Sequence, residues 1–441
     1  MKLETFLRPE FMLYVLAALL ILPSAGCKKP QPPKAIPIEP GWAATRVNAG
    51  VYRHHGIFSF HGRQFVSFYD PDGYATFAYR DLPSEKWTVH HTDWKGNVRD
   101  AHNMISMAAS SDGILHMAYD QHANPLHYRR SAKPLDPTTF GLMIPMTGQK
   151  ENRVTYPMFV NLSDGTLLFF YRDGVSGNGD LYINRYDVEK QTWHPLQNPI
   201  ISGEGRCNPY WCRPAVGSDG SLQLAWCWRR SANAETNSRL CYARSLDGGR
   251  TWQDSRGKPY KLPITPDTAE VIDPIEENSN LSNQDSSEVD SRNRIHVVYR
   301  KNDESGVPQY FHQWWDGHEW RRTQFSQFKS VFTVKGVGTK AIPMSRPNLL
   351  FDNDDRIYVL YRDTRQGSRP MIATAAAPNY DKWKHVTLLD IDLLLWEPTY
   401  DLARWRKERV LDILMQPTGQ GDHEGVTDTG PQMVSVLEYR P

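Results

Sequence analysis

The sequence predicts an all-β fold, a β-propeller of seven blades, from three observations: a long repeat, turn glycines at near-regular intervals, and tryptophans that follow many of the repeats. In each unit a turn leads into an alternating strand that ends in an aromatic residue, and a second strand follows. Units of about 40–55 residues with such a turn and aromatic residue are typical of propeller blades. Six units are visible, and their first strands are HGRQFVSFYD (61–70), SDGILHMAYD (111–120), SDGTLLFFYR (163–172), SDGSLQLAWCWR (218–229), SRNRIHVVYR (291–300) and NDDRIYVLYR (353–362).

The turn glycines set the period of the repeat. Gly62, Gly113, Gly165 and Gly220 follow one another at intervals of 51, 52 and 55 residues. The segments AATRVNAGVY (43–52) and PQMVSVLEY (431–439) are expected to complete a seventh blade. The alternative is an array of β-sandwiches, which rarely keeps this order of turn, aromatic residue and tryptophan. The main helical candidate is LARWRKERVLDIL (402–414).

One turn has a recognisable structural motif. SLDGGRTW (245–252) has the pattern Ser-x-Asp-x-Gly-x-Thr-Trp, known as an Asp-box. Its Asp and Thr are expected to hydrogen-bond the turn backbone, and its Trp to pack between strands. The motif supports the propeller and indicates nothing about chemistry.

The N-terminus has the pattern of an export signal. Lys2 and Arg8 precede an apolar run, FMLYVLAALLILP (11–23), which is too short to span a bilayer comfortably. The run ends in SAGC at Cys27, a pattern that resembles a bacterial lipobox, although Leu is commoner than Ser24 at that position. We therefore expect a lipoprotein signal peptide at 1–27, lipidated Cys27, a Pro-rich tether at 28–41 and one propeller at 42–441. Ordinary signal cleavage nearby is the alternative.

Composition narrows the class of partner. The 51 Lys and Arg residues balance 50 Asp and Glu residues, so the chain lacks the basic excess of a nucleic-acid-binding protein. An exported monomer attached to the membrane only through a lipid, in the periplasm or at a bacterial cell surface, is the expected state. Four further cysteines lie within 35 residues, which suggests disulfides in an exported protein: Cys207, Cys212, Cys227 and Cys241. No paired CxxC spacing supports a metal site there.

Propeller geometry predicts that charged side chains gather on one face. The first two strands of a blade form a hairpin, so the start of the first strand and the end of the second lie opposite the Ser-Asp-Gly turn. His102 opens such a hairpin and His122 follows it. The residues that share this placement are Tyr156, Tyr210, Arg213, Gln284 and Arg346 at strand starts, and Arg172, Arg229, Arg300 and Arg362 at strand ends. Arginine suits carboxylate and sulfate binding, although each Arg could instead cap its own blade through neighbours such as Asp173 or Asp363.

Such a pocket fits proton abstraction beside a carboxylate. The C5 proton of a uronic acid becomes acidic when a cation neutralises the carboxylate, and a His or Tyr can then remove it. A glycoside hydrolase would instead use two carboxyl groups at a set separation, and Asp70 and Asp120 are only ordinary strand-end candidates. The chemistry requires no cofactor.

The histidine-containing blade and the segment TYPMFVNLSDGTLLFFYRDGVSGNGDLYINRYD (155–187) resemble the BNR-repeat propeller family, which includes ulvan lyases and related enzymes that degrade glucuronate–rhamnose polymers. The resemblance spans about residues 45–441. It implies an exported polysaccharide lyase that cleaves an ulvan-like polymer by β-elimination. Matched to the family, His102, His122, Tyr156 and Arg172 are catalytic, with Arg172 binding the uronate carboxylate, and the substrate-binding candidates are Tyr210, Arg213, Arg229, Arg300, Arg346 and Arg362.

The chain departs from the family where Gln223 replaces a histidine, which puts a structural Zn or Ca ion in doubt. Two other functions remain open. One is a hydrolase on the same scaffold, such as an α-L-rhamnosidase that acts at a rhamnose–glucuronate linkage. The other is a non-catalytic, cell-surface glycan-binding propeller.

Overall fold

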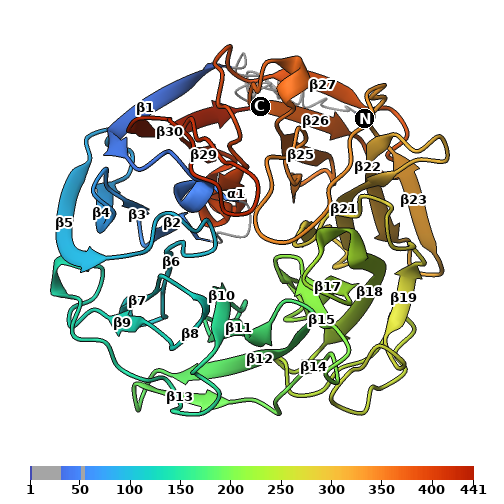
Figure 1. Ribbon diagram of the computed structural model, residues 1–441, viewed down its shortest axis with the longest axis horizontal. Helices are drawn as coiled ribbons and strands as arrows, with labels where there is room; N and C mark the ends of the chain where they lie inside the picture. The colour runs from blue at the N-terminus through green and yellow to red at the C-terminus, as the bar shows by residue number, and fades with distance from the viewer. Residues whose placement is uncertain (2–30, 51–54) are drawn as a thin grey trace.

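The protein is a seven-bladed β-propeller, as the sequence predicts. The computed structural model describes Met1 and residues 31–50 and 55–441, so the predicted signal peptide and Cys27 lie outside the described residues. Seven antiparallel sheets form a ring, and the chain passes from one sheet to the next around it (Figure 1). Within the described ranges, no helix combines the length and apolarity that crossing a bilayer needs.

The strands of each blade follow one another in the sequence. Blade one contains β2 (Ile57–Phe60), β3 (Arg63–Tyr69), β4 (Tyr74–Asp81) and β5 (Thr88–Lys95). Blade two contains β6 (Ser106–Ala109), β7 (Leu115–Ala118) and β9 (Tyr128–Arg130). Blade three contains β8 (His122–Asn124), β10 (Val154–Asn161), β11 (Leu167–Val175), β12 (Asn178–Asp187), β13 (Thr192–Pro195) and β14 (Ile201–Ser202).

The later blades keep this order. Blade four contains β15 (Asn208–Trp211), β16 (Ala215–Val216), β17 (Leu222–Arg229), β18 (Asn237–Ser245) and β19 (Glu270–Asp273). Blade five contains β20 (Ser286–Val289), β21 (Ile295–Asn302), β22 (Pro308–Trp315) and β23 (Trp320–Gln324). Blade six contains β24 (Asn348–Phe351), β25 (Ile357–Tyr361), β26 (Met371–Ala375) and β27 (Lys384–Thr387).

Blade seven joins the two ends of the described chain and corrects the predicted tether. It contains β28 (Thr399–Tyr400), β29 (Leu411–Met415), β30 (Gln432–Arg440) and β1 (Gln31–Gly41). β1 pairs with β30 and closes the ring (Figure 1). The tether prediction fails from Gln31 onward because an edge strand tolerates proline, and the two irregularities of this pairing fall within its proline-containing stretches. Residues 43–50 of the predicted closing segment instead form a loop with a short 3₁₀ helix, η1 (Arg46–Asn48), and residues 51–52 lie outside the described residues.

The turns form as predicted. The marker glycines Gly62, Gly113, Gly165 and Gly220 have φ between 81° and 83°, where a side chain would be strained. In the Asp-box, Thr251 Oγ1 donates to Asp247 Oδ2 at 2.6 Å, and the buried Trp252 donates to the Gly249 carbonyl at 3.0 Å. The apolar core lies between neighbouring sheets, and its largest cluster runs through blades one to five.

Two other predictions are wrong. The helix α1 (Leu402–Glu408) ends earlier than 414, because Arg409 adopts a left-handed conformation and β29 then begins. The four cysteines within the described residues are buried and unpaired rather than disulfide-bonded. Cys227 and Cys241 lie on adjacent strands but one register position apart, since Cys227 faces Leu240. The remaining short helices are η2 (Pro137–Thr139), η3 (Ala234–Thr236) and η4 (Thr364–Gln366).

Candidate active site

The two histidines meet at the end of the second blade's hairpin. His102 lies in the loop before β6, and His122 opens β8, which leaves blade two and pairs with β10 of blade three. In that pairing His122 faces Thr155. The imidazole rings of His102 and His122 stack with centroids 3.9 Å apart and an angle of 17° between their planes. The crossover of β8 therefore brings both imidazoles to the start of β10.

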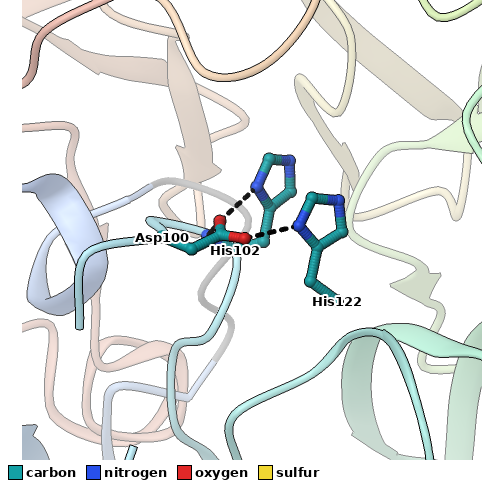
Figure 2. Close-up of side chains that lie close together, drawn as sticks. All are labelled: Asp100, His102 and His122. Carbon is teal, nitrogen blue, oxygen red and sulfur yellow. Dashed lines mark hydrogen bonds and ion pairs between the residues drawn. The ribbon is translucent and has the colours of Figure 1, made fainter. Parts of the chain in front are cut away.

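A single carboxylate holds both rings. Asp100 Oδ1 lies 2.8 Å from His102 Nδ1, and Asp100 Oδ2 lies 2.5 Å from His122 Nδ1 (Figure 2). An ionised carboxylate only accepts hydrogen bonds, so both Nδ1 atoms carry protons. The Nε2 atom of each ring is then turned away from the carboxylate, as Figure 2 shows. Asp100 thereby fixes the tautomer and the orientation of both histidines.

The charges in this cluster oppose one another. The positive charge of His102, followed by burial, lowers the pKa of His122, while the hydrogen bond that His122 donates to Asp100 raises it. Burial raises the pKa of Asp100, but its bonds to His102 and His122 outweigh burial and hold that pKa well below its usual range. Asp100 therefore stays ionised, and His122 favours the neutral form.

Tyr156 stands beside the histidines in an uncommon backbone conformation. Its φ is 58°, in the left-handed region, at an irregularity in the β10–β11 pairing. Such conformations in non-glycine residues cost energy and concentrate at functional sites. The Tyr156 ring lies 5.6 Å from the His102 ring and 5.8 Å from the Tyr210 ring. The irregular strand thus places one phenol between an imidazole and a second phenol.

Two arginines surround the second phenol. Tyr210 Oη accepts from Arg229 at 3.2 Å and from Arg172 at 3.4 Å, and lies 2.9 Å from Ser176 Oγ. Burial raises the pKa of Tyr210, but the charges of Arg229 and Arg172, with hydrogen bonds from Ser176 and Tyr156, lower it to about 7. Tyr210, which is hydrogen-bonded to Tyr156, is therefore poised to lose a proton near neutral pH.

The structure places Arg172 beneath the phenols rather than at an open surface. Arg172 is 1% exposed, and its guanidinium carbon lies 5.0 Å from the centre of the Tyr156 ring. Its Nη2 donates to Thr155 Oγ1 at 3.1 Å, whereas the neighbouring Asp173 lies 3.8 Å from Arg153. The predicted carboxylate-binding role of Arg172 stays a prediction, and its contacts favour an electrostatic action on Tyr156 and Tyr210.

Three more of the predicted arginines are bound by the protein itself. Arg300 and Arg362 donate to main-chain carbonyls, including those of Met344 and Trp396. Arg346 donates to both oxygens of the fully buried Glu397, at 3.0 and 3.1 Å. Arg300 and Arg346 line the same narrow cavity as His102 and Tyr156, of about 40 Å³, whereas Arg362 does not. Their contacts indicate that they hold the loops around the site together.

Arg213 lies elsewhere, so its predicted place in the site is wrong. It lines a larger cavity of about 740 Å³ that is built from turn residues and α1, and neither His102 nor His122 lines this cavity. Its guanidinium lies 3.1 Å from Glu288 and 2.6 Å from Tyr400 Oη. The prediction failed because Arg213 follows the end of β15 (Asn208–Trp211), the first strand of its blade, and does not lie at its start.

Sequence reasoning missed three residues of the site. Asp100 belongs to the DAHN segment, but its two-sided contact depends on the crossover of β8. Glu424 Oε1 lies 3.4 Å from His102 Nδ1, and Lys340 lines the cavity beside Tyr156 and Arg229. The Lys340 ammonium lies 3.3 Å from His423 Nδ1 and has no carboxylate within 4.0 Å among residues 31–50 and 55–441. Glu424 and Lys340 lie in irregular loops outside the strand repeat, so the repeat pattern of the sequence could not indicate them.

Only one cluster in the described part of the chain has the residue types and spacing of a metal site. The ligand-type atoms of Asp100, His102 and His122 lie within 4.8 Å of one another. A metal ion there would have to replace the two hydrogen bonds at Asp100, because it would need the Nδ1 atoms deprotonated. Gln223, where the family resemblance suggested a lost ligand, accepts from Tyr242 Oη at 2.6 Å and donates to the Asn293 carbonyl at 2.8 Å.

Comparison with known proteins agrees with this architecture. A 257-residue alignment is 28% identical to the long isoform of an ulvan lyase from Pseudoalteromonas sp. (strain PLSV) and covers 44% of this chain and 25% of that protein. A 240-residue alignment is 30% identical to the short isoform of an ulvan lyase from Alteromonas sp. (strain LOR) and covers 42% of this chain and 45% of that protein. The alignments therefore span a quarter to less than half of these relatives.

Solved structures share the fold across most of the chain. A PL25 ulvan lyase bound to -[GlcA(1-4)Rha3S]- superposes with a TM-score of 0.70 at 12% identity, covering 92% of this chain and 96% of that one. The polysaccharide lyase Uly1 superposes with a TM-score of 0.66 at 17% identity, covering 87% and 90%. The family model described as "BNR repeat-containing family member" matches residues 63–328, more than half of the chain. The protein belongs to the BNR repeat-containing family.

Proposed function

We propose that this protein is a polysaccharide lyase that cleaves a uronic-acid-containing, ulvan-like polymer by β-elimination. The observation that carries the proposal is the joint placement of two imidazoles on one carboxylate beside two phenols, of which Tyr210 accepts hydrogen bonds from two arginines. The aligned relatives are ulvan lyases, and a solved relative of the same fold binds a glucuronate–rhamnose sulfate unit, which supports this substrate class.

Elimination first needs a cation near the uronate carboxylate. Lys340 and Arg229 line the cavity, and Lys340 has no carboxylate partner within the described residues. A cation at the substrate carboxylate stabilises the carbanion-like charge that develops when the C5 proton leaves. We assign this role to Lys340, with Arg229 adding positive charge from behind Tyr210.

The phenols and imidazoles then move the protons. A group of the Tyr156–Tyr210 pair that is ionised near neutral pH, or neutral His122, takes the C5 proton. The electrons of the C5–H bond form the C4–C5 double bond, and the C4–O bond breaks. The leaving oxygen takes a proton from His102 or Tyr156. Arg172 and Arg229 stabilise the phenolate form, so a tyrosine acts as base without a strongly basic solution.

The same geometry disfavours the hydrolase alternative. Glycoside hydrolysis uses two carboxyl groups, one to protonate the leaving oxygen and one to act on water or the sugar. Both oxygens of Asp100 are held by imidazoles, whereas Glu424 accepts from the Thr339 amide at 2.6 Å through Oε1 and its Oε2 has no hydrogen-bond partner within the described residues. Asp100 is therefore not available as a second catalytic carboxyl group, and elimination uses these residues better than hydrolysis does.

The test is ultraviolet absorbance of the unsaturated uronate product. The purified protein is mixed with ulvan and with other uronic-acid polymers, and Tyr156→Phe and His102→Ala proteins run alongside. We expect absorbance to rise with the wild type and to fall by about 10²–10⁴-fold in rate with each variant. Release of saturated rhamnose without absorbance would favour the hydrolase. Binding without any product would favour the non-catalytic glycan-binding propeller.

We also propose that the protein is exported and anchored through lipidated Cys27. The apolar run at 11–23 and the SAGC sequence at 24–27 support this proposal. A Cys27→Ala protein should move from the membrane fraction to the soluble exported fraction. Equal membrane recovery of both proteins would contradict lipidation at Cys27.

A further inference from the structure

We infer that a second site, between blades four and five, binds an anionic polysaccharide chain through an arginine cluster. The identity of the ligand rests on the proposed function, and the site itself rests on the arginines that line one cavity. Blades four and five are neighbours in the ring (Figure 1). Between their turns lies a cavity of about 590 Å³, within the size range of ligand pockets.

Arginine dominates the lining of this cavity. Arg244 lies near the end of β18 in blade four, and Arg256 belongs to the loop after the Asp-box. Arg292 and Arg294 lie in the turn region before β21. Asp219 is the acidic residue of the lining, and its Oδ1 accepts from the Ser221 amide at 3.0 Å. Four guanidinium groups therefore share one polar cavity with a single carboxylate.

The positive charge is only partly neutralised by the protein. Arg294 is paired with Asp290, from Nε to Oδ2 at 2.6 Å. In the described part of the chain, Arg244, Arg256 and Arg292 have no carboxylate within 4.0 Å. Unpaired guanidinium groups in one cavity repel each other, and an anion with several oxygens relieves that repulsion through bidentate hydrogen bonds. Carboxylate and sulfate groups on a sugar chain both meet this requirement.

The cluster is not a general property of the fold. An equivalent groove of about 340 Å³ lies between the turns of blades two and three. Its lining contains one arginine, Arg185, and three acidic residues, Asp164, Asp187 and Glu189. The two grooves are built from corresponding turns but have opposite charge. Blades four and five therefore differ in chemistry at a position where the architecture is the same.

The cavity also offers an aromatic wall. Trp315, at the end of β22, is half-buried and lines the cavity next to the turn that contains His318. Its indole packs against Trp320 with ring centroids 5.5 Å apart, which holds its orientation. An indole face can cover the apolar side of a sugar ring while arginines bind the charged groups.

This site is separate from the histidine site. The two cavities share no lining residue, and the second is built from turns of the Ser-Asp-Gly type, which lie on the opposite side of each hairpin from His102 and His122. A site there holds a polymer without occupying the reaction centre. We expect this second site to keep the enzyme bound to long polysaccharide chains.

The experiment is electrophoresis of the whole protein through native gels that contain ulvan, a measurement that needs no turnover. We expect the wild type and Tyr156→Phe to be retarded, and the combined Arg256→Ala and Arg292→Ala protein to bind about tenfold more weakly. Both arginines are exposed, so Tm should stay within about 2 °C of the wild type. The matched control is Arg185→Ala from the acidic groove, which should be retarded like the wild type.

Two results would overturn the inference. One is retardation of the double variant to the same extent as the wild type. The other is an equal loss of retardation in Arg185→Ala, which would indicate a non-specific effect of charge. A gel with uncharged dextran should retard none of the proteins. Activity on short oligosaccharides should be unchanged in the double variant, whereas failure of the proposed function would remove activity from every protein and leave the gel result intact.

Discussion

Replacing Asp100 with Asn should disable both histidines at once. The carboxylate accepts from His102 Nδ1 at 2.8 Å and from His122 Nδ1 at 2.5 Å, and an amide can accept at only one of its two atoms. Hydrogen bonds to charged groups contribute about 1.5–3 kcal/mol each. If both imidazoles lose their orientation in the transition state, about 3–6 kcal/mol is lost, which corresponds to about 10²–10⁴-fold in kcat.

The assay is initial rate by ultraviolet absorbance over a range of pH. KM should change less than kcat, because Asp100 orients groups that act in the transition state. The hydrogen bond to Asp100 raises the pKa of His122, so its loss lowers that pKa further. If neutral His122 is required, the acid limb of kcat/KM moves to lower pH in the variant.

The matched control is Asp120→Asn. Asp120 has a similar side-chain exposure, 18% against 16% for Asp100, but its oxygens contact the Asn97 amide and His127 rather than the histidine pair. This variant should keep kcat within about threefold of the wild type. The reasoning fails if Asp100→Asn retains kcat within the same threefold and its acid limb does not move.

Other predictions follow from single contacts. Lys340→Gln should raise KM for the polymer about tenfold or more, because its ammonium is assigned to the substrate carboxylate, and steady-state kinetics would check this. Arg229→Gln should raise the pKa of Tyr210 above its value of about 7, and phenolate absorbance during a pH titration would measure the shift. Glu397→Gln should destabilise the fold by about 3–5 kcal/mol in denaturant unfolding, because Glu397 is fully buried and pairs with Arg46 at 3.2 Å and Arg346 at 3.0 Å. Deleting residues 31–41 should lower Tm by several degrees, on the order of 2–4 °C for each kcal/mol lost, because β30 would lose its partner strand. An unchanged Tm would indicate that this segment is a tether and does not stabilise the fold.

The repeat was enough to predict the propeller, because its signals are local. Turn glycines with positive φ, such as Gly113 and Gly165, and the Asp-box at Ser245–Trp252 need only their own neighbours. Ring closure by β1 was not predictable from composition, since a Pro-rich segment forms a strand only when an edge position is open to it. The end of α1 at Glu408 depends likewise on where β29 pairs with β30.

The sequence predicted which residues of the site share a face, but not where each side chain points. Hairpin geometry predicts that His102 and His122 lie on one face, and in the structure the crossover of β8 to blade three brings their rings into contact. The same geometry cannot say where a guanidinium points. Arg300, Arg346 and Arg362 occupy the expected strand positions but bind protein acceptors, and Lys340 reaches the cavity from a loop that has no periodic pattern.

The most direct test of the central claim is the mass of the products formed from ulvan in heavy-oxygen water. Elimination transfers a proton within the site and adds no water, whereas hydrolysis adds one water to each cleaved linkage. We predict unsaturated products without heavy oxygen from the wild type, and no such products from Tyr156→Phe. Incorporation of heavy oxygen into a new reducing end, in step with cleavage, would contradict the account and assign the site to hydrolysis.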